Sequence, residues 1–433
     1  MKPREISMLT TAPFTRITMS SVRKVIISGA GIAGLATALA LRQRGVEVTV
    51  LEQAVDLREV GAGLQIAPNG SRVLQALGMG AAIEAVACEA AAKEVRLWNS
   101  GRRWPLFDLG ADARARFGAP YWMLHRGDLH QALRAALDAA APGALHTGVR
   151  VLRAQTLGDA VRVTAADGRE FEAEVMVAAD GVHSVQRRSI CGEGAAAFTG
   201  LMAWRGVVPT ARLPPELCEP VGINWVGPGG HAITYPLRLG KLLNVVAIVE
   251  KPEWRGESWS DAGTHEEVHR DLAGWHPDLH RLIDAMDTPF RWALLSRPPL
   301  AGWVEGRSVL IGDAAHPTLP FLAQGANMAL EDAWLLARCL TELHDADAAL
   351  SRFVALRLPR TTRMVQGAAD NTSRFHNPLL ADPATAAAYI DREWEPTRVR
   401  QRYDWLFEYD VTRLPLDPPP MTAFDSKTET TTS

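Results

Sequence analysis

The chain has few of the features that mark extracellular scaffolds, membrane proteins or nucleic-acid binders. Its 433 residues include only four cysteines, which are scattered without a Cys-x-x-Cys pair. Such sparse cysteines argue against a disulfide framework or a zinc site and are typical of the cytoplasm, where we expect the protein. The formal net charge of −3 offers no attraction to nucleic acid or to an anionic membrane surface. The apolar stretch at 26–41 is short and broken by glycine, so we expect no membrane span.

The two ends of the chain differ in composition from the part between them. Residues 1–21 carry several charges and no apolar core of signal-peptide length, so we expect a flexible extension. Residues 416–433 are rich in proline, serine and threonine, a composition typical of a disordered tail. The length between them is sufficient for two domains.

A glycine-rich motif near the N-terminus predicts a dinucleotide site. The apolar run Lys24-Val-Ile-Ile-Ser28 predicts a buried strand and leads directly into Gly29-Ala-Gly-Ile-Ala-Gly34. A helical stretch and a second strand follow, and that strand ends at Glu52, about 20 residues after the glycines. Glycines there let the backbone approach a pyrophosphate, and a carboxylate at Glu52 accepts hydrogen bonds from ribose hydroxyls. A glycine turn without a ligand is the alternative interpretation.

Charged or polar groups also stand at the ends of several later predicted elements. Arg126 precedes a predicted helix, where it can reach a phosphate or merely pair with Asp128. Asp180-Gly181 follows a predicted strand, with an ordinary turn as the alternative. Gly312-Asp313 ends another strand, where ligands bind in open α/β sheets. A helix that begins at 324–327 can offer its amides to negative charge.

The order of predicted elements indicates an α/β fold. A Rossmann-like domain with a parallel sheet is interrupted by a domain with a mainly antiparallel sheet, and helices follow at the C-terminus. The Rossmann-like domain is expected at 22–75, 105–200 and 292–372, the second domain at 76–104 and 201–291, and the C-terminal helical region at 373–415. His316 and Asp313 have no third potential ligand nearby, so no metal site is expected.

These segments, in this order and at these separations, resemble the single-component FAD-dependent aromatic hydroxylases, the family of para-hydroxybenzoate hydroxylase. The resemblance covers residues 23–380 and implies FAD as the cofactor. It implies that the glycine motif and Glu52 hold the ADP half, that Gly312-Asp313 holds the flavin side chain and pyrophosphate, and that 325–327 lies by the flavin ring. The residues that it implies for cofactor binding are Gly29, Gly31, Ala33, Gly34, Glu52, Gln53, Ala62, Gly63, Arg126, Val151, Asp180, Gly181, Gly312, Asp313, Gly325, Ala326 and Asn327.

Within the family, the stretches 59–65, 120–130, 226–238 and 403–409 are most similar to 3-hydroxybenzoate 6-hydroxylases, with 6-hydroxynicotinate 3-monooxygenases and salicylate hydroxylases as relatives. His231 and Tyr235 match a His-x-x-x-Tyr pair that contacts the phenol in these enzymes. On an alternating strand both side chains share one face. The resemblance therefore implies that they are catalytic and accept or relay the phenol proton. A sheet histidine and a core tyrosine without such a role are the alternative.

Four further residues are expected to bind the substrate. The resemblance to 3-hydroxybenzoate 6-hydroxylases implies a glutamine where this chain has Pro320-Phe321, whereas a proline there is similar to para-hydroxybenzoate hydroxylase. We expect Pro320, Phe321 and Trp204 to line the pocket, with core packing as the alternative for the two aromatic residues. Arg205 either meets a substrate carboxylate or forms a structural ion pair.

The reaction that the resemblance implies is insertion of one oxygen atom from O2 into a small phenolic acid, hydroxybenzoate-like, through a C4a-hydroperoxyflavin. NADH or NADPH would be the transient electron donor, and no second glycine motif predicts a separate nicotinamide domain. Hydroxylation of a hydroxynicotinate, or of a salicylate with loss of CO2, is an alternative. A flavin dehydrogenase or oxidase without hydroxylation is a further one. A monomer or homodimer is expected.

Overall fold

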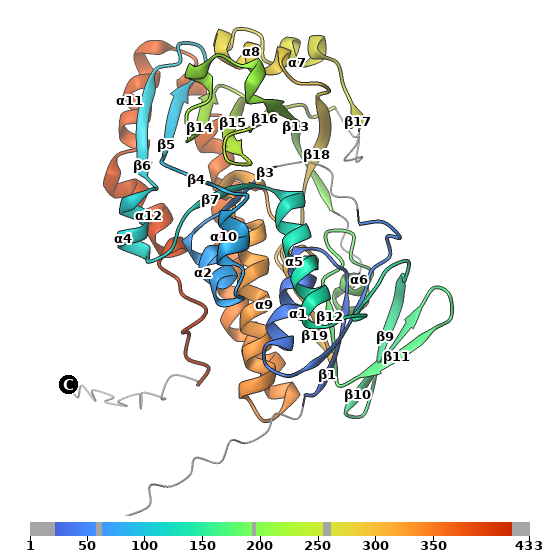
Figure 1. The fold of residues 1–433 in the computed structure, drawn as a ribbon. Coiled ribbons are helices and arrows are strands. Elements are labelled where there is room, and N and C mark those ends of the chain that lie inside the picture. Colours follow the sequence, from blue (N-terminus) through green and yellow to red (C-terminus); the bar gives the residue numbers. More distant parts are fainter. Residues whose placement is uncertain (1–21, 58–62, 193–195, 254–260, 418–433) are drawn as a thin grey trace, which may run out of the picture.

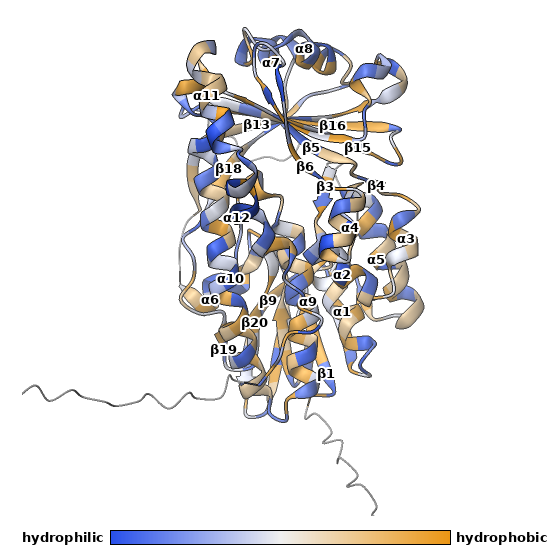
Figure 2. Cartoon of the chain, turned by 90° about the vertical axis from the view of Figure 1, so that its left-hand side faces the viewer, coloured by the Kyte–Doolittle hydropathy of each residue, from blue (hydrophilic) through white to orange (hydrophobic). Residues whose placement is uncertain are grey.

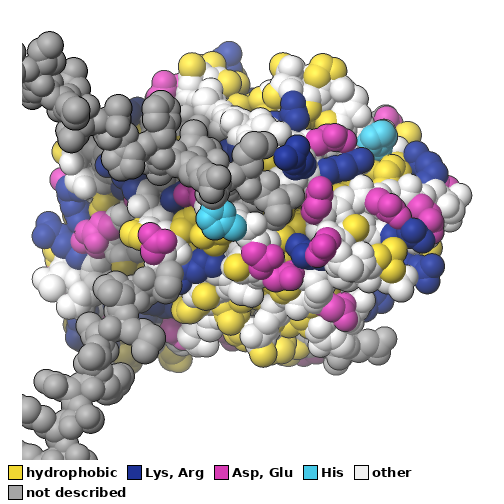
Figure 3. Space-filling model, turned by 90° about the horizontal axis from the view of Figure 1, so that it is seen from below, with side chains coloured by type: hydrophobic (Ala, Val, Ile, Leu, Met, Phe, Trp, Pro, Cys, Tyr) yellow, Lys and Arg dark blue, Asp and Glu magenta, His cyan; other side chains and the backbone are white. Residues whose placement is uncertain are grey.

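The computed structural model describes residues 22–57, 63–192, 196–253 and 261–417. The predicted extension at 1–21, Ala62 and all but two residues of the predicted tail lie outside the described residues. Within the described part of the chain, no helix combines the length and the apolar character that crossing a bilayer requires. Figure 3 shows acidic and basic side chains interspersed on the face seen from below, in keeping with the net charge of −3.

A six-stranded sheet forms the centre of the lower part of the molecule (Figure 1), in the order β19-β20-β12-β1-β2-β8. Its strands are β1 (Lys24–Ser28), β2 (Glu47–Leu51), β8 (Leu145–His146), β12 (Val175–Ala178), β19 (Val304–Glu305) and β20 (Ser308–Leu310). All neighbours are parallel except β19 and β20. Because Ser28 pairs with both Leu51 and Ala178, and Ala178 pairs with Leu310, the carboxyl ends of four strands meet at one edge of the sheet.

Helices cover one face of this sheet and a small sheet covers the other. The helices are α1 (Ile32–Arg42), α5 (Arg126–Ala140) and α9 (Gly325–Glu342), and α10 (Ala346–Phe375) packs against α9. The opposite three-stranded sheet consists of β9 (Val151–Leu157), β10 (Ala160–Ala165) and β11 (Glu170–Ala173). Burial on both faces explains why β1 and β12 are almost wholly apolar.

An eight-stranded sheet forms the upper part, and Figure 2 shows it nearly edge-on. In spatial order its strands are β17 (Asp261–Ala262), β18 (Phe290–Ser296), β13 (Ala197–Pro209), β16 (Leu242–Glu250), β15 (Gly230–Leu237), β14 (Val221–Gly227), β5 (Ala92–Leu97) and β6 (Arg103–Asp108). Neighbours are antiparallel except β14 and β5, so the predicted mainly antiparallel sheet is confirmed. One face packs beneath α7 (His265–Asp271) and α8 (Pro277–Asp284), and the other faces the lower part.

Short elements join the two parts. Three strands form a small sheet between them: β3 (Gly63–Ile66), β7 (Trp122–His125) and β4 (Cys88–Glu89). The remaining α-helices are α2 (Pro68–Ala76), α3 (Gly80–Glu84), α4 (Ala111–Phe117), α6 (Val185–Cys191), α11 (Pro383–Glu393) and α12 (Pro396–Phe407). The 3-10 turns are η1 (Thr210–Arg212), η2 (Pro215–Leu217), η3 (Gly312–Ala314), η4 (Pro320–Leu322) and η5 (Pro378–Leu380).

Candidate active site

The glycine-rich turn after β1 leaves an open approach to the start of α1. Gly29 has a φ of 102°, which favours glycine, and a Cβ there would lie 2.5 Å from the carbonyl oxygen of Ala179. A Cβ on Gly34 would lie 1.9 Å from the carbonyl oxygen of Gly29, so this glycine lets the helix pack on the turn. A Cβ on Gly31 would meet no atom within 4 Å. Gly31 therefore borders open space at a helix N-terminus, where an anion can approach the backbone.

The Glu52 carboxylate holds this turn from the neighbouring strand. Its Oε2 accepts a hydrogen bond from the N–H of Ala30 at 2.8 Å, and its Oε1 accepts one from the N–H of Ala54 at 2.8 Å. Glu52 is half buried, and Gln53 beside it is exposed. The carboxylate can therefore orient the glycine turn and still offer oxygen lone pairs to a ligand.

Two other predicted cofactor contacts lie away from the glycine turn. Val151 is buried in the core of the lower part. Gly63 begins β3, where its N–H donates to Oδ1 of Asn244 at 2.8 Å and an added Cβ would lie 2.5 Å from the ring of Tyr235. Gly63 thus lets β3 approach the eight-stranded sheet more closely than a residue with a Cβ would allow.

Asp180 follows β12 at the same edge of the parallel sheet. Its Oδ2 accepts a hydrogen bond from the N–H of Val185 at 3.0 Å, whereas its buried Oδ1 makes none within the described residues. Burial raises the pKa of the Asp180 carboxyl. Gly181 has a φ of 77°, and an added Cβ would meet nothing within 4 Å. The pair leaves a carboxylate oxygen for a hydrogen-bond donor beside open space.

Gly312 and Asp313 follow β20 at this edge as well. Gly312 has a φ of 57°, and its N–H donates to Oδ2 of Asp332 at 2.9 Å. The Asp313 side chain is exposed, yet so much protein surrounds it that burial raises the pKa of its carboxyl, an effect that His316 and Arg126 partly offset. An accessible but poorly hydrated carboxyl is suited to hydrogen bonds from ligand hydroxyls.

Arg126 lies between this edge and the upper sheet. It begins α5, and it is close enough to Asp313 to lower the pKa of that carboxyl and to Arg205 to lower the pKa of that guanidinium. The carboxylate of Asp128, its alternative partner in the sequence, accepts two hydrogen bonds of 2.8 Å from Arg238. The position of Arg126 suits an anionic ligand that spans both parts of the molecule.

A buried ion cluster supports the Gly312-Asp313 corner from behind. Oδ2 of Asp332 contacts Nε2 of His316 at 2.6 Å, and its Oδ1 accepts from Nε of Arg357 at 2.7 Å. Arg357 also pairs with Glu331, which accepts from Arg360 at 2.8 Å. Burial raises the pKa of Asp332, but His316 and Arg357 outweigh it and the pKa of this carboxyl is lowered. Within the described residues no three potential metal ligands gather, so the cluster is held by ion pairs.

The N-terminus of α9 meets the same region. Gly325 begins this helix, and no side chain caps its first amides. Asn327 is fully buried: its Oδ1 accepts from the N–H of Ala67 at 2.9 Å, and its Nδ2 donates to the carbonyl oxygen of Gln65 at 3.1 Å. The Asn327 side chain therefore fastens α9 to β3, and only the backbone at Gly325, Ala326 and Asn327 remains for a ligand.

His231 and Tyr235 lie on the same face of β15, as predicted. His231 is fully buried, and burial and His376 hold its pKa well below the usual value. Its Nδ1 lies 2.7 Å from Nε2 of His376, whereas its Nε2 is buried and has no hydrogen-bond partner among the described residues. Burial raises the pKa of the Tyr235 phenol, whose neighbour is the amide of Gln65. A neutral imidazole can accept a proton there, whereas Tyr235 stays protonated.

The expectation that Trp204 lines the substrate pocket is wrong, and core packing, its alternative, is correct. The register places Trp204 opposite Ala247 and Ala232, on the face that packs under α7, and its indole donates to Oδ2 of Asp271 at 2.7 Å. His231 points to the other face, since neighbouring residues of a strand alternate. Arg205 shares the face of His231 and is buried, with its guanidinium 4.6 Å from the ring centre of Trp292. Burial and Arg126 lower the pKa of Arg205 to about 10.

The loop before α9 places Phe321 against His231. Pro320 is exposed and Phe321 is buried, and the Phe321 ring meets the imidazole edge-on at 4.8 Å between centres. The carbonyl oxygen of Phe321 accepts a hydrogen bond from Nδ2 of Asn371 in α10 at 3.0 Å. The structure therefore brings the predicted loop to the predicted catalytic histidine.

Several residues of this region were not anticipated. Lys93 on β5 shares the face of Tyr235, and burial lowers its pKa to about 7. Glu250 and His376 extend the contacts of His231 toward the surface. No local sequence pattern pointed to any of the three, because their contacts depend on strands and helices that are distant in the chain.

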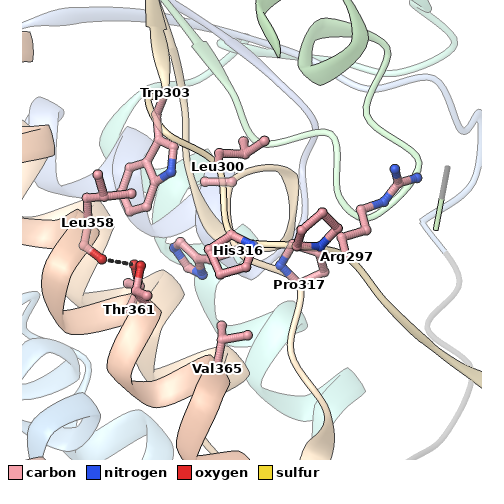
Figure 4. A pocket seen from close by; sticks show the side chains of 12 residues that line it. Arg297, Leu300, Trp303, His316, Pro317, Leu358, Thr361 and Val365 are labelled. Carbon is pink, nitrogen blue, oxygen red and sulfur yellow. Dashed lines mark hydrogen bonds between the residues drawn. The ribbon is translucent and has the colours of Figure 1, made fainter. Parts of the chain in front are cut away.

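A separate small pocket lies behind the Gly312–Ala314 turn. Figure 4 shows Trp303, Leu300, Leu358 and Val365 around it, with His316 at its wall. None of the predicted cofactor or substrate residues lines this pocket. It is therefore distinct from the site at the sheet edge.

Comparisons with known proteins agree with this geometry. Residues 23–368 match the model of the family described as FAD binding domain. The chain is 38% identical over 389 residues to a 3-amino-4-hydroxybenzoate 2-monooxygenase of Streptomyces platensis, covering 90% of this chain and 96% of that one. It is 34% identical to 3-hydroxybenzoate 6-hydroxylase 1 of Aquipseudomonas alcaligenes, covering 88% of this chain and 97% of the other.

A solved structure extends the likeness to three dimensions. It is that of the Klebsiella pneumoniae protein HpxO complexed with FAD and uric acid, which is 27% identical. It matches with a TM-score of 0.78 over 91% of this chain and 99% of that one. The predicted family and fold are thereby confirmed: the chain belongs to the FAD binding domain family and is an FAD-dependent aromatic monooxygenase.

Proposed function

We propose that this enzyme hydroxylates a small aromatic acid that carries a phenol, of the hydroxybenzoate class, with NADH or NADPH as transient electron donor. The observation that carries the proposal is the buried imidazole of His231, whose Nε2 has no hydrogen-bond partner in the described chain and which shares a face with Tyr235. A phenol hydroxyl supplies the donor that this atom lacks. The substrates named for the two relatives, an aminohydroxybenzoate and a hydroxybenzoate, support the same class.

The residues at the sheet edge fit FAD. Open space beside Gly31 and the N-terminus of α1 suit the pyrophosphate, and Glu52 suits the adenosine ribose. Asp313 suits the hydroxyls of the flavin side chain, and the uncapped start of α9 suits negative charge on the ring. When bound, FAD supplies the redox centre that passes electrons to O2 and one oxygen atom to the substrate.

The protein's own groups then orient the ring and keep water out. Phe321 and the buried strand face around His231 exclude solvent from the phenol end. His231 is neutral and accepts the phenol proton at Nε2, because a phenolate is a better nucleophile than a phenol. Tyr235, with its raised pKa, remains a hydrogen-bond donor beside it.

Two cations on the same face, the buried Arg205 and the half-buried Lys93, favour an anionic substrate. Arg205 and Lys93 share the face of His231 and Tyr235, and burial lowers the pKa of both. A substrate carboxylate would stabilise a positive charge that is costly to bury. We propose Arg205 as its partner, since Arg205 also lies near Arg126 at the cofactor edge.

A substrate screen tests the proposal. Holoenzyme is mixed with hydroxybenzoates, aminohydroxybenzoates, hydroxynicotinates and salicylate, and NADH and NADPH oxidation are followed with product mass under ¹⁸O₂. We expect stimulation by at least one hydroxybenzoate and one labelled oxygen atom in its product, with the matching uncharged phenol a poor substrate. Electron transfer without oxygen in any product would favour a dehydrogenase or oxidase instead, and release of CO2 would favour a salicylate-type reaction.

We also propose a cytoplasmic enzyme that is a monomer or homodimer. All four cysteines are free, which suits a reducing compartment. Light scattering of the holoenzyme distinguishes the two assembly states. The cofactor contacts that the resemblance implies, and the expected boundaries of the two domains, are predictions.

A further inference from the structure

A chain of three titratable side chains connects His231 to the surface. Nδ1 of His231 lies 2.7 Å from Nε2 of His376, and Nδ1 of His376 lies 3.1 Å from Oε1 of Glu250. His231 comes from β15, Glu250 ends β16, and His376 directly follows α10. The two imidazoles are buried, whereas the side chain of Glu250 is 54% exposed. This row of three side chains therefore begins in solvent at Glu250 and ends in the protein core at His231.

The contacts define which nitrogen atoms carry hydrogen. An ionised carboxylate only accepts, so Nδ1 of His376 donates to Glu250 and its Nε2 is left as an acceptor. Nδ1 of His231 must then donate to His376, which leaves a lone pair on Nε2 of His231. Glu250 thus sets the tautomer of both imidazoles, and Nε2 of His231 becomes an unprotonated hydrogen-bond acceptor.

Among the residues that the structure describes, His376 is the titratable side chain that contacts the imidazole of His231. The residues that pack on its imidazole from other elements are Phe321 of η4 and Phe375 of α10, with ring centres at 4.8 and 5.0 Å. Its neighbours in register are Val226 on β14 and Ile248 on β16, which carry no charge. Within the described residues, the titratable groups connected to it are His376 and, beyond it, Glu250.

We propose that Glu250, His376 and His231 form a proton relay that carries the phenol proton of the substrate to solvent. The substrate O–H bond breaks as a bond to Nε2 of His231 forms. The proton on Nδ1 of His231 moves to Nε2 of His376, and the proton on Nδ1 of His376 moves to Glu250, which releases it to water. No oxidant or further reactant is needed. The relay rests on the proposed function, because it requires a phenol at His231.

The geometry explains why such a relay is needed. A buried imidazolium next to a second imidazole is unfavourable, so His231 cannot keep the proton that it accepts. Handing its other proton to His376 keeps the inner imidazole neutral throughout. Glu250 and His376 are therefore positioning and relay residues, and of the three relay residues only His231 touches the substrate.

The test measures ionisation of a bound phenol on oxidised holoenzyme, without NADH or NADPH. The probe is 3-amino-4-hydroxybenzoate, with 3-hydroxybenzoate and 4-hydroxybenzoate in parallel, and the phenolate absorbance of the complex is recorded from pH 5.5 to 9. The key variant is Glu250→Gln, whose amide oxygen can still accept from His376 but whose side chain takes up no proton. His376→Gln interrupts the middle of the chain, and Glu305→Gln on β19 is a control with an exposed carboxylate of no assigned role.

We expect Glu250→Gln and His376→Gln to slow deprotonation of the bound phenol after a pH jump at least tenfold, because each variant interrupts the route by which the proton leaves. Flavin absorbance and probe affinity should stay within twofold, and Glu305→Gln should match the wild type. In Glu250→Ala, added formate should restore the rate, which a purely structural role would not allow.

Two outcomes would overturn the relay, and they differ in what they say about the proposed function. Wild-type rates of phenol deprotonation in both relay variants, or no rescue by formate, would remove Glu250 and His376 from proton transfer and leave the hydroxylase proposal intact. Failure of wild-type holoenzyme to bind any of the three phenols removes the relay together with the hydroxybenzoate proposal.

Discussion

At the scale of single residues, two glycines of one motif serve different ends. Gly34 is needed by the protein itself, because an added Cβ would lie 1.9 Å from the carbonyl oxygen of Gly29. Gly31 is not, because an added Cβ would meet nothing within 4 Å in the protein. We expect the open space at Gly31 to receive the cofactor, so that the two positions separate folding from cofactor binding.

Alanine at each position tests this separation. Gly31→Ala should leave the unfolding free energy of the apoprotein within about 0.5 kcal/mol of the wild type and lower FAD affinity at least tenfold, since a methyl group would meet the pyrophosphate. Gly34→Ala should destabilise the apoprotein by roughly 3 kcal/mol through overpacking. Urea unfolding and flavin fluorescence titration measure the two effects. Unchanged FAD affinity in Gly31→Ala would exclude the pyrophosphate from this turn.

Lys93 is a half-buried cation that lowers stability at neutral pH. Its ammonium lies 5.2 Å from the ring centre of Tyr121, and within the described chain no carboxylate forms an ion pair with it. Burial lowers its pKa from 10.5 to about 7. Between these two values the unfolded chain binds more protons than the folded one, so folding becomes more favourable as pH rises through this range.

Lys93→Met should remove this dependence. At pH 7 the variant should be more stable than the wild type by roughly 2 kcal/mol. One unit of pKa shift corresponds to about 1.4 kcal/mol, and the total is reduced because the ammonium is partly exposed to solvent. The difference should shrink as pH rises toward 10. The control is Lys24→Met, because Lys24 is exposed beside Glu47. Equal slopes of stability against pH in wild type and Lys93→Met would contradict the burial of a charged amine.

At the scale of elements, α9 and α10 are joined by the buried ion cluster of Glu331, Asp332 and Arg357. All three side chains are fully buried, and Asp332 also accepts from the N–H of Gly312. Removal of the Arg357 guanidinium would leave the negative charges of Glu331 and Asp332 incompletely neutralised in the protein interior, which is energetically costly. The cluster therefore fixes both the helix pair and the corner that precedes Asp313.

Arg357→Met should cost about 3–5 kcal/mol of unfolding free energy, the usual effect of breaking a buried ion pair on one side. Arg162→Met, which removes an exposed pair with Glu172, should have far less effect, because solvent screens a surface ion pair. Urea unfolding of both apoproteins supplies the comparison. Similar losses in the two variants would show that the α9–α10 cluster contributes no more than a surface pair.

Sequence patterns predicted these elements where the signal was local. Apolar runs and glycine stops located β1, α1, β2 and α9 within a few residues. Strand alternation placed His231 and Tyr235 on one face correctly. The same rule shows why Trp204 and Arg205, which are adjacent on β13, cannot both face the substrate. His376 could not be predicted, because it meets His231 across 145 positions and no local pattern records that contact.

At the scale of the whole molecule, the two parts are tied at several points around the proposed site. The N–H of Gly63 donates to Asn244 on β16, and Arg238 after β15 pairs with Asp128 on α5. The indole of Trp98 on the segment after β5 donates to the carbonyl oxygen of Leu380 at 2.9 Å. Since these links tie the eight-stranded sheet to β3, α5 and η5, the upper part should not unfold separately from the lower part.

FAD should therefore stabilise the whole molecule in one transition. At a free FAD concentration of 100 times Kd, the unfolding free energy should rise by about 2.7 kcal/mol. Calorimetry with and without FAD would show a single peak that moves as a unit, whereas Gly31→Ala should show a much smaller shift. A second peak that does not respond to FAD would mean that the upper sheet unfolds independently.

The long helix α10 connects the region of Asp313 with the region of His231. It carries Arg357, which supports the corner before Asp313, and it leads directly into His376, which touches His231. Each residue advances a helix by about 1.5 Å and turns it by roughly 100°. One inserted or deleted residue between these two positions would thus rotate the imidazole away from its partner while the ion cluster stayed in place. Evolutionary change in this segment should accordingly proceed by substitution at constant length, and insertions should collect in the connections outside it.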